Sequence, residues 1–564
     1  MRSIIFWTAS ARVPRLVSVA ATLLAVAAPS VGQIRLAHVF GDHMVLQRDE
    51  PVAIWGQAPA GERVRVRFGG QSESARAGDD GWWSVRLPPL VANAAGRELI
   101  VEGKDQEPIV VTDVVVGEVW ICGGQSNMEW KLRGSRDADL EVASADYPGI
   151  RFLRLPHVAR KDTQRDIPVA AGEKPPHWRL ARGPDVGECT AVGYYFARRL
   201  HRSLRVPVGL VDTSWGGTMA QHWVSKETLG RIDRMKSYFK SWLERQEEWD
   251  EVGGEEGAAR RFDEAVAAWQ EAKGKAAADG KRAPRRPRRD AFADPSTQRH
   301  PGGMFAAMIA PIAAYTVRGV LFYQGENNAF GESWKPFPVT FPAVISDWRT
   351  AFGKPKLPFG LIQIAGWSTR RSMTYDMNHH TNIVREVQHR VWETTEHTGL
   401  IVTYDANSNG NIHPRRKLPV GGRSARWALS TVYQKTDDRG RPIAWRGPVY
   451  ESIKVTGKRI LVSFSDETDD GLRLDQDAAL GFYVAGEDRV FHIADARVRK
   501  RDVEVWSDAV KAPVAVRYAW SNLPLGTLLN GRELPAYPFR SDDWPLVPHQ
   551  STGSYELARP PREP

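Results

Sequence analysis

The sequence predicts an α/β protein: a three-layer, flavodoxin-like domain with a largely parallel sheet, flanked by two β-rich domains and interrupted by a helical insertion. Three observations predict this class. Between residues 113 and 440, apolar runs of strand length alternate with segments of helical spacing. Short β-prone runs separated by turns fill the segments on either side. At 564 residues the chain is too long for one core, and roughly two to four domains are expected.

Residues 1–32 have the pattern of a signal peptide. Arg2, Arg12 and Arg15 precede an apolar run at 16–28, and small residues follow it. Because this run is short for a membrane span, we expect cleavage and a secreted or periplasmic protein, with an uncleaved anchor as the alternative. No later stretch approaches roughly 18 apolar residues, so no integral membrane span is expected in the mature chain.

The β-rich domains are expected at the two ends of the mature chain. Residues 33–112 should form a β-sandwich, with strands at 53–56, 63–68 and 82–85 between Gly- and Asp-rich turns. Residues 441–564 again contain short β-prone runs separated by turns, which predicts a second β-rich domain. Since 33–112 contains no cluster of catalytic side chains, we expect it to serve packing or substrate support.

The α/β domain is predicted in two parts, 113–230 and 301–440. Its expected strands lie at 114–122, 206–212, 317–323, 359–364 and 400–404, and its expected helices at 191–204, 334–351, 381–395 and 415–432. Residues 231–300, between the two parts, combine charged residues and alanines at helical spacing and predict a helical insertion.

The net charge of +10 is concentrated near the end of this insertion, where residues 281–289 (KRAPRRPRR) carry six cations in nine positions. Such a run is most often a solvated loop, and binding of an acidic polymer is the alternative. No aromatic residues interleave with the cations, so no nucleic-acid partner is expected.

Cys122 and Cys189 are the two cysteines of the chain. They exclude a disulfide scaffold, although one bridge stays open for an exported protein. Cys122 lies in an apolar, strand-like run, which disfavours a thiol nucleophile. The neighbouring His379 and His380 have no partners at ligand spacing, so neither a metal nor another cofactor is expected.

Polar groups follow four of the predicted strands, at 123–130, 212–218, 323–329 and 407–414. In an open α/β sheet, the carboxyl ends of the strands form the edge where ligands bind. A serine after two glycines can begin a helix, where backbone N–H groups stabilise an oxyanion. A histidine late in the chain supplies the base that such a serine needs. Each signal is weak alone, because serines in Gly-rich turns commonly serve as caps.

Together, these four groups resemble the sialate O-acetylesterase family of SGNH hydrolases, and the resemblance covers nearly the whole mature chain. It rests on VFGDHMVLQ at 39–47, GQSNMEW at 124–130, SWGGT at 214–218, YQGENNA at 323–329, DWR at 347–349, IHPRRK at 412–417, RYAW at 517–520 and LPAYPFRSDDW at 534–544. The resemblance implies an SGNH-hydrolase domain that removes acetyl groups from an O-acetylated carbohydrate by two-step acyl transfer.

Carried over to this sequence, the resemblance makes Ser126 the nucleophile and His413 the general base. It assigns the oxyanion to the N–H groups of Ser126 and Gly217 and to one amide of the third group. Asn328 is expected to supply that amide, and Gln324 is the alternative.

Four side chains are also expected to bind substrate: Gln125, Gln324, Glu326 and Arg385. For Glu326 the alternative is a structural hydrogen bond. For Arg385, and for Gln388 on the same predicted helix, the alternative is packing.

One position departs from the family pattern. An Asp usually precedes the catalytic histidine by two or three residues, where this chain has Asn411 and Gly410. An amide cannot stabilise an imidazolium as a carboxylate does. Three interpretations stay open: a Ser–His dyad oriented by Asn411 or by a main-chain carbonyl, a more distant carboxylate such as Asp405, or a chain that has lost the activity.

The competing function is a non-catalytic carbohydrate-binding or cell-surface protein that uses the same cleft. The missing Asp supports it, whereas the presence of both Ser126 and His413 argues against it. A peptidase or lipase is disfavoured because the Gly-x-Ser-x-Gly turn is absent from the sequence.

Overall fold

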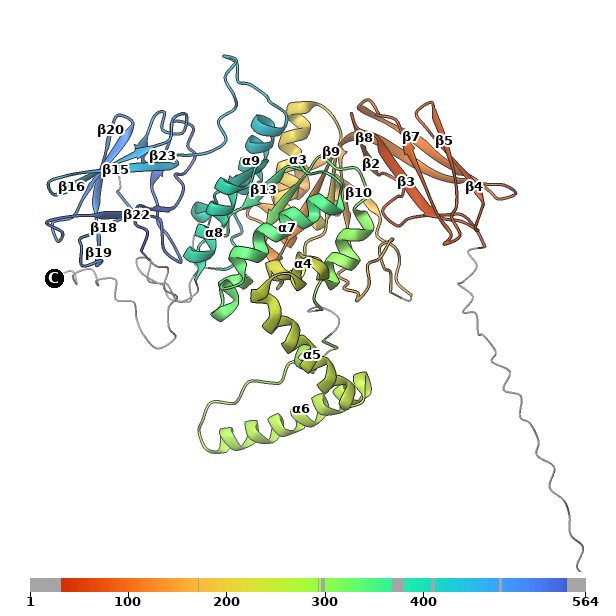
Figure 1. Cartoon of the computed structure of the whole chain (residues 1–564), viewed down its shortest axis with the longest axis horizontal. Helices are drawn as coiled ribbons and strands as arrows, with labels where there is room; N and C mark the ends of the chain where they lie inside the picture. The colour runs from red at the N-terminus through yellow and green to blue at the C-terminus, as the bar shows by residue number, and fades with distance from the viewer. Residues whose placement is uncertain are drawn as a thin grey trace, which may run out of the picture.

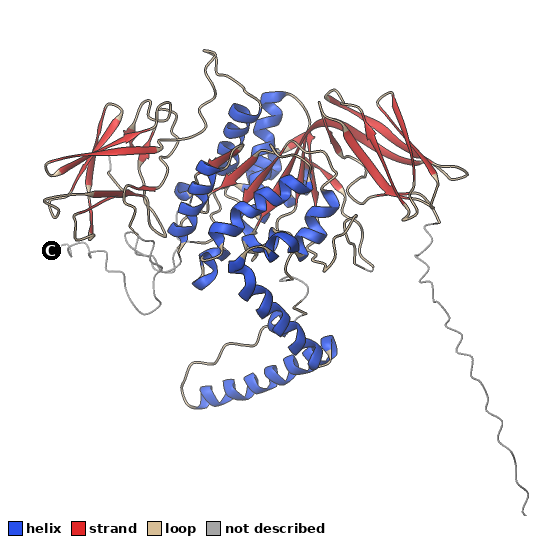
Figure 2. Ribbon diagram, in the orientation of Figure 1, coloured by secondary structure: helices blue, strands red, loops and turns tan. Residues whose placement is uncertain are grey.

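The computed structural model describes residues 32–170, 172–292, 294–295, 300–367, 380–406, 411–475 and 479–544. Two β-rich regions lie at opposite ends of a central region of mixed helices and strands, and a helical arm extends from the centre (Figure 1; Figure 2). No helix in these ranges is both long enough and apolar enough to cross a membrane. Residues 1–31 of the predicted signal peptide lie outside the described residues.

The N-terminal β-rich region contributes to two sheets. β1 (Arg35–Leu36), β3 (Val52–Gln57) and β6 (Trp82–Leu87) form a three-stranded sheet. β2 (Val45–Gln47), β4 (Arg63–Phe68), β5 (Gln71–Arg76) and β7 (Asn93–Glu102) join a larger sheet through β8 (Ile109–Gly124). In β4 the arginines point outward and the apolar residues are buried, which is the alternation that predicted this strand.

β8 connects the N-terminal region to the central one. Its first part pairs with β7 and β2, and its second part pairs in parallel with β11 (Val208–Asp212) and β12 (Gly319–Tyr323). The strand therefore runs without interruption past residue 112, where the sequence suggested a domain boundary. The domain limits themselves remain predictions.

The central part of the sheet has the order β10-β9-β11-β8-β12-β13-β14. Its other strands are β9 (Asp146–Arg154), β10 (Trp178–Arg182), β13 (Phe359–Ile362) and β14 (Thr398–Ile401). Only the β9–β10 pair along this order is antiparallel. Because β8, β11 and β12 are parallel neighbours, the segments that follow them meet at one edge of the sheet.

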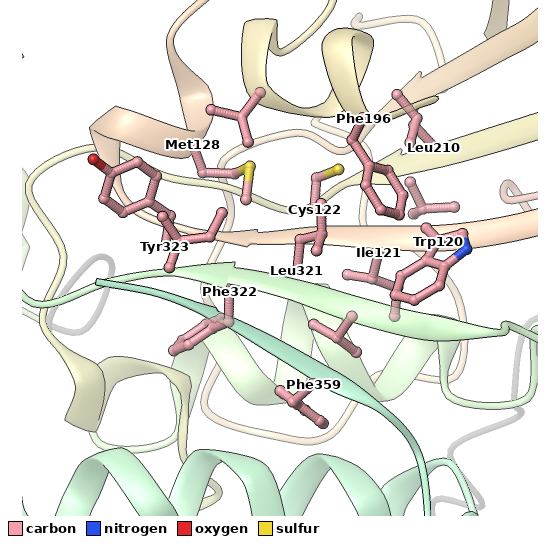
Figure 3. Close-up of a cluster of buried hydrophobic side chains, with 14 of the residues drawn as sticks. Trp120, Ile121, Cys122, Met128, Phe196, Leu210, Leu321, Phe322, Tyr323 and Phe359 are labelled. Atoms are coloured by element: carbon pink, nitrogen blue, oxygen red, sulfur yellow. The ribbon is translucent and has the colours of Figure 1, made fainter. Parts of the chain in front are cut away.

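Four long helices pack in pairs around this sheet. α3 (Ala191–Leu204) lies against α9 (Leu418–Trp427), and α7 (Phe337–Ala351) lies against α8 (Thr381–Thr394). Figure 3 shows Cys122 and Phe196 on one side of the strands and Phe322 and Phe359 on the other. β11, β12 and residues 114–124 of β8 are buried, which explains their continuous apolar runs.

The two cysteines are buried as free thiols, so no disulfide joins Cys122 to Cys189. Burial raises the pKa of both thiols well above the usual value, which makes a thiolate unfavourable at either position.

The predicted insertion forms a helical arm made of α5 (Lys236–Glu251) and α6 (Gly254–Ala278), which stands away from the sheet (Figure 1). The basic loop at 281–289 returns along α6, where the indole N–H of Trp269 donates to the carbonyl of Pro284 at 2.8 Å. Nearly all of the loop is exposed, as expected for a solvated segment.

The C-terminal region contains β15 to β24. β15 (Tyr450–Thr456), β16 (Arg459–Phe464), β21 (Asp502–Trp506) and β20 (Asp495–Arg499) form one sheet. β19 (Phe491–Ile493), β18 (Phe482–Ala485), β22 (Ala515–Tyr518) and β24 (Phe539–Arg540) form another. β17 (Arg473–Leu474) pairs with β23 (Leu528–Leu529). Tyr537 connects this region to the central sheet, because its hydroxyl donates to the carbonyl of Leu400 at 2.5 Å.

Candidate active site

Ser126 begins the short helix α1 (Ser126–Glu129), directly after β8 turns at the sheet edge. Gly124 makes the turn with φ of +122°, a value that favours glycine, and a Cβ there would lie 2.1 Å from the carbonyl oxygen of Tyr323. The Gln125 N–H donates to that same carbonyl at 2.9 Å. The neighbouring strand β12 therefore fixes the point at which Ser126 leaves the sheet.

The structure brings His413 to Ser126, although 287 residues separate them in the chain. His413 Nε2 lies 2.8 Å from Ser126 Oγ. The imidazole stacks on the indole of Trp130, with ring centroids 5.4 Å apart and an angle of 22° between the planes. This arrangement places a base within hydrogen-bond reach of the serine hydroxyl.

The environment of His413 lowers the pKa of its imidazole. Burial is the largest cause, and the positive charge of Lys417 adds to it, while the carboxylate of Glu129 acts in the opposite direction. A lowered pKa keeps the imidazole neutral at physiological pH, which is the state that accepts a proton from serine.

Neither named candidate for orienting the His413 ring takes that role. Asn411 Oδ1 accepts the backbone N–H of His413 at 2.9 Å, so this oxygen fixes the main chain of the loop. Asp405 forms a two-point ion pair with Arg423, at 2.6 and 2.7 Å, so the expectation of a distant Asp405 partner is wrong. Within the described ranges, His413 Nδ1 has no hydrogen-bond partner. Gly410 lies outside those ranges.

The second group of polar residues lies beside the serine. The Gly216 N–H donates to Glu129 Oε2 at 2.7 Å, and a Cβ on Gly216 would lie 3.2 Å from the Cβ of Ser126. Gly217 follows with φ of +76°, and its carbonyl accepts a hydrogen bond from the side chain of Asn327. Its N–H has no acceptor among the described residues, so it is available to a ligand.

The prediction that Asn328 donates to the oxyanion is corrected by its contacts. The side chain is fully buried, and its Nδ2 donates to Gln221 Oε1 at 3.2 Å and to the Ser333 carbonyl at 3.0 Å. Its Oδ1 accepts the Ala220 N–H at 2.9 Å. The amide therefore holds neighbouring loops together and has no donor left for the oxyanion.

The side-chain oxygen of Gln125 and the side-chain amide of Gln324 have structural roles, which replace the predicted substrate contact of Gln324, while that of Gln125 stays a prediction. Gln324 is fully buried, and its Nε2 donates to Gln125 Oε1 at 2.8 Å and to the Thr218 carbonyl at 2.9 Å. Gln125 Oε1 also accepts the N–H of Asn327 at 3.2 Å. These two amides join the first, second and third polar groups into one unit.

Arg385 and Gln388 are buried and contact other parts of the chain, as the packing alternative expected. The Arg385 guanidinium is buried and donates to the carbonyl of Ser521 in the C-terminal region. Gln388 Nε2 donates to the carbonyl of Gln324 at 3.0 Å. Burial lowers the pKa of Arg385 to about 9.

A buried polar cluster lies directly behind the serine. Asn127 Nδ2 donates to Glu326 Oε1 at 2.5 Å and to the carbonyl of Ile412 at 2.9 Å. Lys417 Nζ donates to Asn127 Oδ1 at 2.5 Å. Burial raises the pKa of Glu326 to about 7 and lowers that of Lys417 to about 7. The contact of Glu326 with Asn127 corresponds to the structural alternative, in place of the expected substrate contact.

Sequence reasoning missed several residues of this site: Asn127, Glu129, Trp130 and Lys417. All four lie inside the GQSNMEW and IHPRRK motifs. Their position inside these motifs could have identified them, since each lies within four residues of Ser126 or His413.

The arrangement is suited to acyl transfer. A serine hydroxyl next to a neutral imidazole can act as a nucleophile, and N–H groups at Ser126 and Gly217 can bind an oxyanion. Among the described residues, no group of three or more His, Cys, Asp and Glu is arranged to hold a metal ion.

Comparison with known proteins identifies similar enzymes. Residues 298–418 match a family described as carbohydrate esterase, sialic acid-specific acetylesterase. Sialate O-acetylesterase of Rattus norvegicus is 26% identical over 76% of this chain and 78% of its own length. The Mus musculus enzyme is 25% identical over 90% of this chain and 94% of its own.

A solved structure covers a similar extent of the chain. The crystal structure of a carbohydrate acetylesterase from Xanthomonas citri is 30% identical in sequence, with a TM-score of 0.72. The match covers 91% of this chain and all of that one.

Proposed function

This chain belongs to the sialate O-acetylesterase family and is a carbohydrate O-acetylesterase, and from that premise we propose that it acts by two-step acyl transfer through Ser126. The observation that carries the proposal is the 2.8 Å approach of His413 Nε2 to Ser126 Oγ at the start of α1. The substrates proposed are O-acetylated sialic acid or an O-acetylated polysaccharide, in line with the names of the related enzymes.

In the first step, His413 Nε2 takes the proton of the Ser126 hydroxyl while Oγ attacks the acetyl carbonyl carbon. The negative charge that develops on the carbonyl oxygen is stabilised by the N–H groups of Ser126 and Gly217. When the intermediate collapses, the C–O bond to the sugar breaks and His413 returns the proton to the sugar oxygen. The deacetylated sugar leaves, and Ser126 carries the acetyl group.

In the second step, His413 takes a proton from water, and the resulting hydroxide attacks the acetyl carbonyl of the acyl-enzyme. The same two N–H groups stabilise the second oxyanion. The bond between Ser126 Oγ and the acyl carbon then breaks as His413 protonates Oγ, acetic acid leaves and ionises to acetate in solvent, and the enzyme returns to its starting state.

Two further parts of the proposal concern architecture and location. We propose a three-layer SGNH arrangement, supported by the pairing of α3 with α9 and of α7 with α8 on the mixed sheet. We also propose that the protein is exported, supported by the charged and then apolar pattern of residues 1–32.

The decisive test is hydrolysis of an aryl acetate by the exported protein, whose N-terminal residue should lie near residue 33. Ser126→Ala should lower kcat at least about 10³-fold, because the acyl-enzyme can no longer form. Ser346→Ala, which changes an exposed serine of α7 outside the site, should have parental kcat.

Rapid mixing of the parent with substrate should give a burst of phenol product, and mass spectrometry should locate an acetyl group on Ser126. Full activity in Ser126→Ala would overturn the mechanism. Absence of Ser126-dependent turnover on aryl acetates and on acetylated glycans would support the non-catalytic, carbohydrate-binding alternative.

A further inference from the structure

Asn127 occupies the centre of the buried cluster behind the nucleophile, and its two charged neighbours fix the direction of its amide. Glu326 and Lys417 each favour the charged form of the other. In that ionised state the lysine ammonium only donates and the carboxylate only accepts, so Lys417 selects Oδ1 and Glu326 selects Nδ2. All three side chains are at most 3% exposed. A flipped amide would present a carbonyl to a carboxylate and an NH₂ to an ammonium, both of which are unfavourable.

This fixed direction leaves the second Nδ2 proton of Asn127 with one acceptor, the carbonyl of Ile412 at 2.9 Å. Asn127 follows Ser126 in the chain, and Ile412 precedes His413. The Asn127–Ile412 hydrogen bond therefore lies one residue away from the 2.8 Å Ser126–His413 contact on both sides. The two segments that carry nucleophile and base are thus joined twice.

Lys417 anchors the other end of the same loop. Its Nζ donates to Asn127, and its ammonium faces the rings of Trp130 and Tyr323, at 5.9 and 5.5 Å from the centroids. Trp130 in turn stacks on His413. The loop from Ile412 to Lys417 is consequently attached to the Ser126 side of the site before and after the catalytic histidine.

We propose that Asn127, held by Glu326 and Lys417, is the positioning residue that keeps His413 against Ser126 in this carboxylate-poor site. This inference rests on the proposed roles of Ser126 and His413. In a triad, a carboxylate behind the histidine fixes the ring. Here Asn411 binds the main chain and Asp405 is paired with Arg423, so the described residues supply this constraint through the loop instead.

The first test is Asn127→Asp, which keeps the size of the side chain and removes both N–H donors. We expect kcat for an aryl acetate to fall about 10²-fold with KM within twofold, because a displacement near 1 Å between reacting groups has an effect of that order. An unchanged KM would show that the substrate-binding surface is intact.

Asn530→Asp is the matched control. Asn530 is a buried asparagine in the C-terminal region whose Nδ2 also donates to two carbonyls, those of Arg446 and Thr468, both at 3.2 Å. The two variants should lose stability to a similar degree. Only Asn127→Asp should lose kcat when both are assayed well below their unfolding temperatures.

A second pair of variants applies even if Asn127→Asp does not fold. Glu326→Gln keeps an oxygen that accepts from Asn127 Nδ2, whereas Glu326→Leu has a similar volume and no acceptor. We expect Glu326→Gln to retain kcat within about threefold and Glu326→Leu to lose about tenfold, with KM unchanged in both. This rescue by the conservative variant is not expected from a purely structural role.

The outcomes separate this inference from the mechanism on which it rests. If Ser126→Ala keeps its activity, the proposed mechanism fails. If Ser126→Ala is inactive while Asn127→Asp retains kcat within threefold, the mechanism stands and the positioning role of Asn127 is overturned. Equal kcat for Glu326→Gln and Glu326→Leu would overturn it as well.

Discussion

Two charges of opposite sign act on His413, and both come from residues inside the motifs that carry Ser126 and His413. Lys417 lowers the pKa of the imidazole and Glu129 raises it, while burial lowers it further. Glu129 also accepts the Gly216 N–H and a 2.6 Å hydrogen bond from Arg154. The carboxylate that acts on His413 is therefore on the nucleophile's helix and acts through space, without direct contact with the ring.

A prediction for pH dependence follows from these charges. His413 must be neutral to act as base, so kcat/KM should fall as the pH drops through its pKa. Because that pKa is lowered, the acid limb of the parent profile should lie below pH 6.5. Lys417→Met should move the limb to higher pH, and Glu129→Gln should move it to lower pH. Both are measured as kcat/KM for an aryl acetate.

The control for this profile is Arg416→Met, which removes an exposed cation from the same loop. Arg416 donates to the carbonyl of Asp405 and does not contribute to the shift at His413. The acid limb of the kcat/KM profile of Arg416→Met should coincide with that of the parent. A parental limb above pH 6.5, or a limb that Lys417→Met leaves in place, would contradict the electrostatic account.

At the residue scale, sequence reasoning paired Ser126 with His413, which lie 2.8 Å apart in the structure, but it misplaced the amide side chains of Asn328 and Gln324. The motifs place Asn328 and Gln324 near the site, but they do not show which way a side chain points. For Asn328 the direction is set by Gln221, which is 107 residues away. The contact between Asn127 and Lys417 spans 290 residues, so the local sequence pattern could not predict it either.

At the scale of elements, the α3–α9 contact determines where the histidine loop ends. Gly421 of α9 lies against α3, and a Cβ there would be 2.6 Å from the Cβ of Tyr195 and 2.7 Å from the carbonyl oxygen of Val192. Because the contact with Val192 involves its backbone carbonyl, the helices can adjust to an added Cβ only by moving apart. Because α9 begins directly after Lys417, its position is coupled to the loop that carries His413.

Alanine substitutions at two adjacent glycines of α9 are therefore expected to have opposite effects on stability. Gly421→Ala should destabilise the protein by about 1–3 kcal/mol, since the added methyl forces α9 away from α3. Gly422→Ala meets no atom within 4 Å and should be neutral or stabilising by up to about 1 kcal/mol, because alanine favours helix over glycine. Unfolding by urea, followed by tryptophan fluorescence, measures both. Equal losses in the two variants would contradict this packing argument.

Elements were easier to predict from the sequence than contacts between them. The predicted helix at 191–204 coincides with α3, whose apolar residues recur at helical spacing. The strand predicted at 114–122 is part of a longer one, because β8 begins at Ile109 in the N-terminal region. Local pattern shows that a strand exists, whereas its length depends on partners elsewhere in the chain.

At the scale of the whole molecule, α8 connects the C-terminal region to the edge of the sheet that carries Ser126. Glu386 on this helix accepts hydrogen bonds from Arg540 Nε at 2.9 Å and from the indole of Trp520 at 3.0 Å. Two residues later, Gln388 donates to the carbonyl of Gln324 in the third polar group. Besides the Tyr537–Leu400 contact, α8 is therefore a route by which loosening of the C-terminal region reaches the third polar group.

Glu386→Gln tests this connection. The Glu386 and Arg540 side chains are only 11% and 7% exposed. Removing the charge of Glu386 leaves a buried cation poorly compensated, which destabilises the protein by up to about 3–5 kcal/mol. Arg540 keeps its contact with Asp542 at 3.1 Å, which limits the loss. We expect the temperature of inactivation and the midpoint of unfolding to fall together, with kcat at 25 °C unchanged within about twofold.

The matched control is Glu393→Gln on the same helix, where the side chain is 52% exposed and an ion pair joins it to His389 at 3.4 Å. An exposed pair contributes at most about 1 kcal/mol, so this variant should inactivate and unfold at nearly the parental temperature. If Glu386→Gln lowers the unfolding midpoint while activity persists to the parental temperature, the C-terminal region unfolds independently of the sheet edge that carries Ser126. A shared decrease, absent in Glu393→Gln, indicates that α8 makes the two parts one cooperative unit.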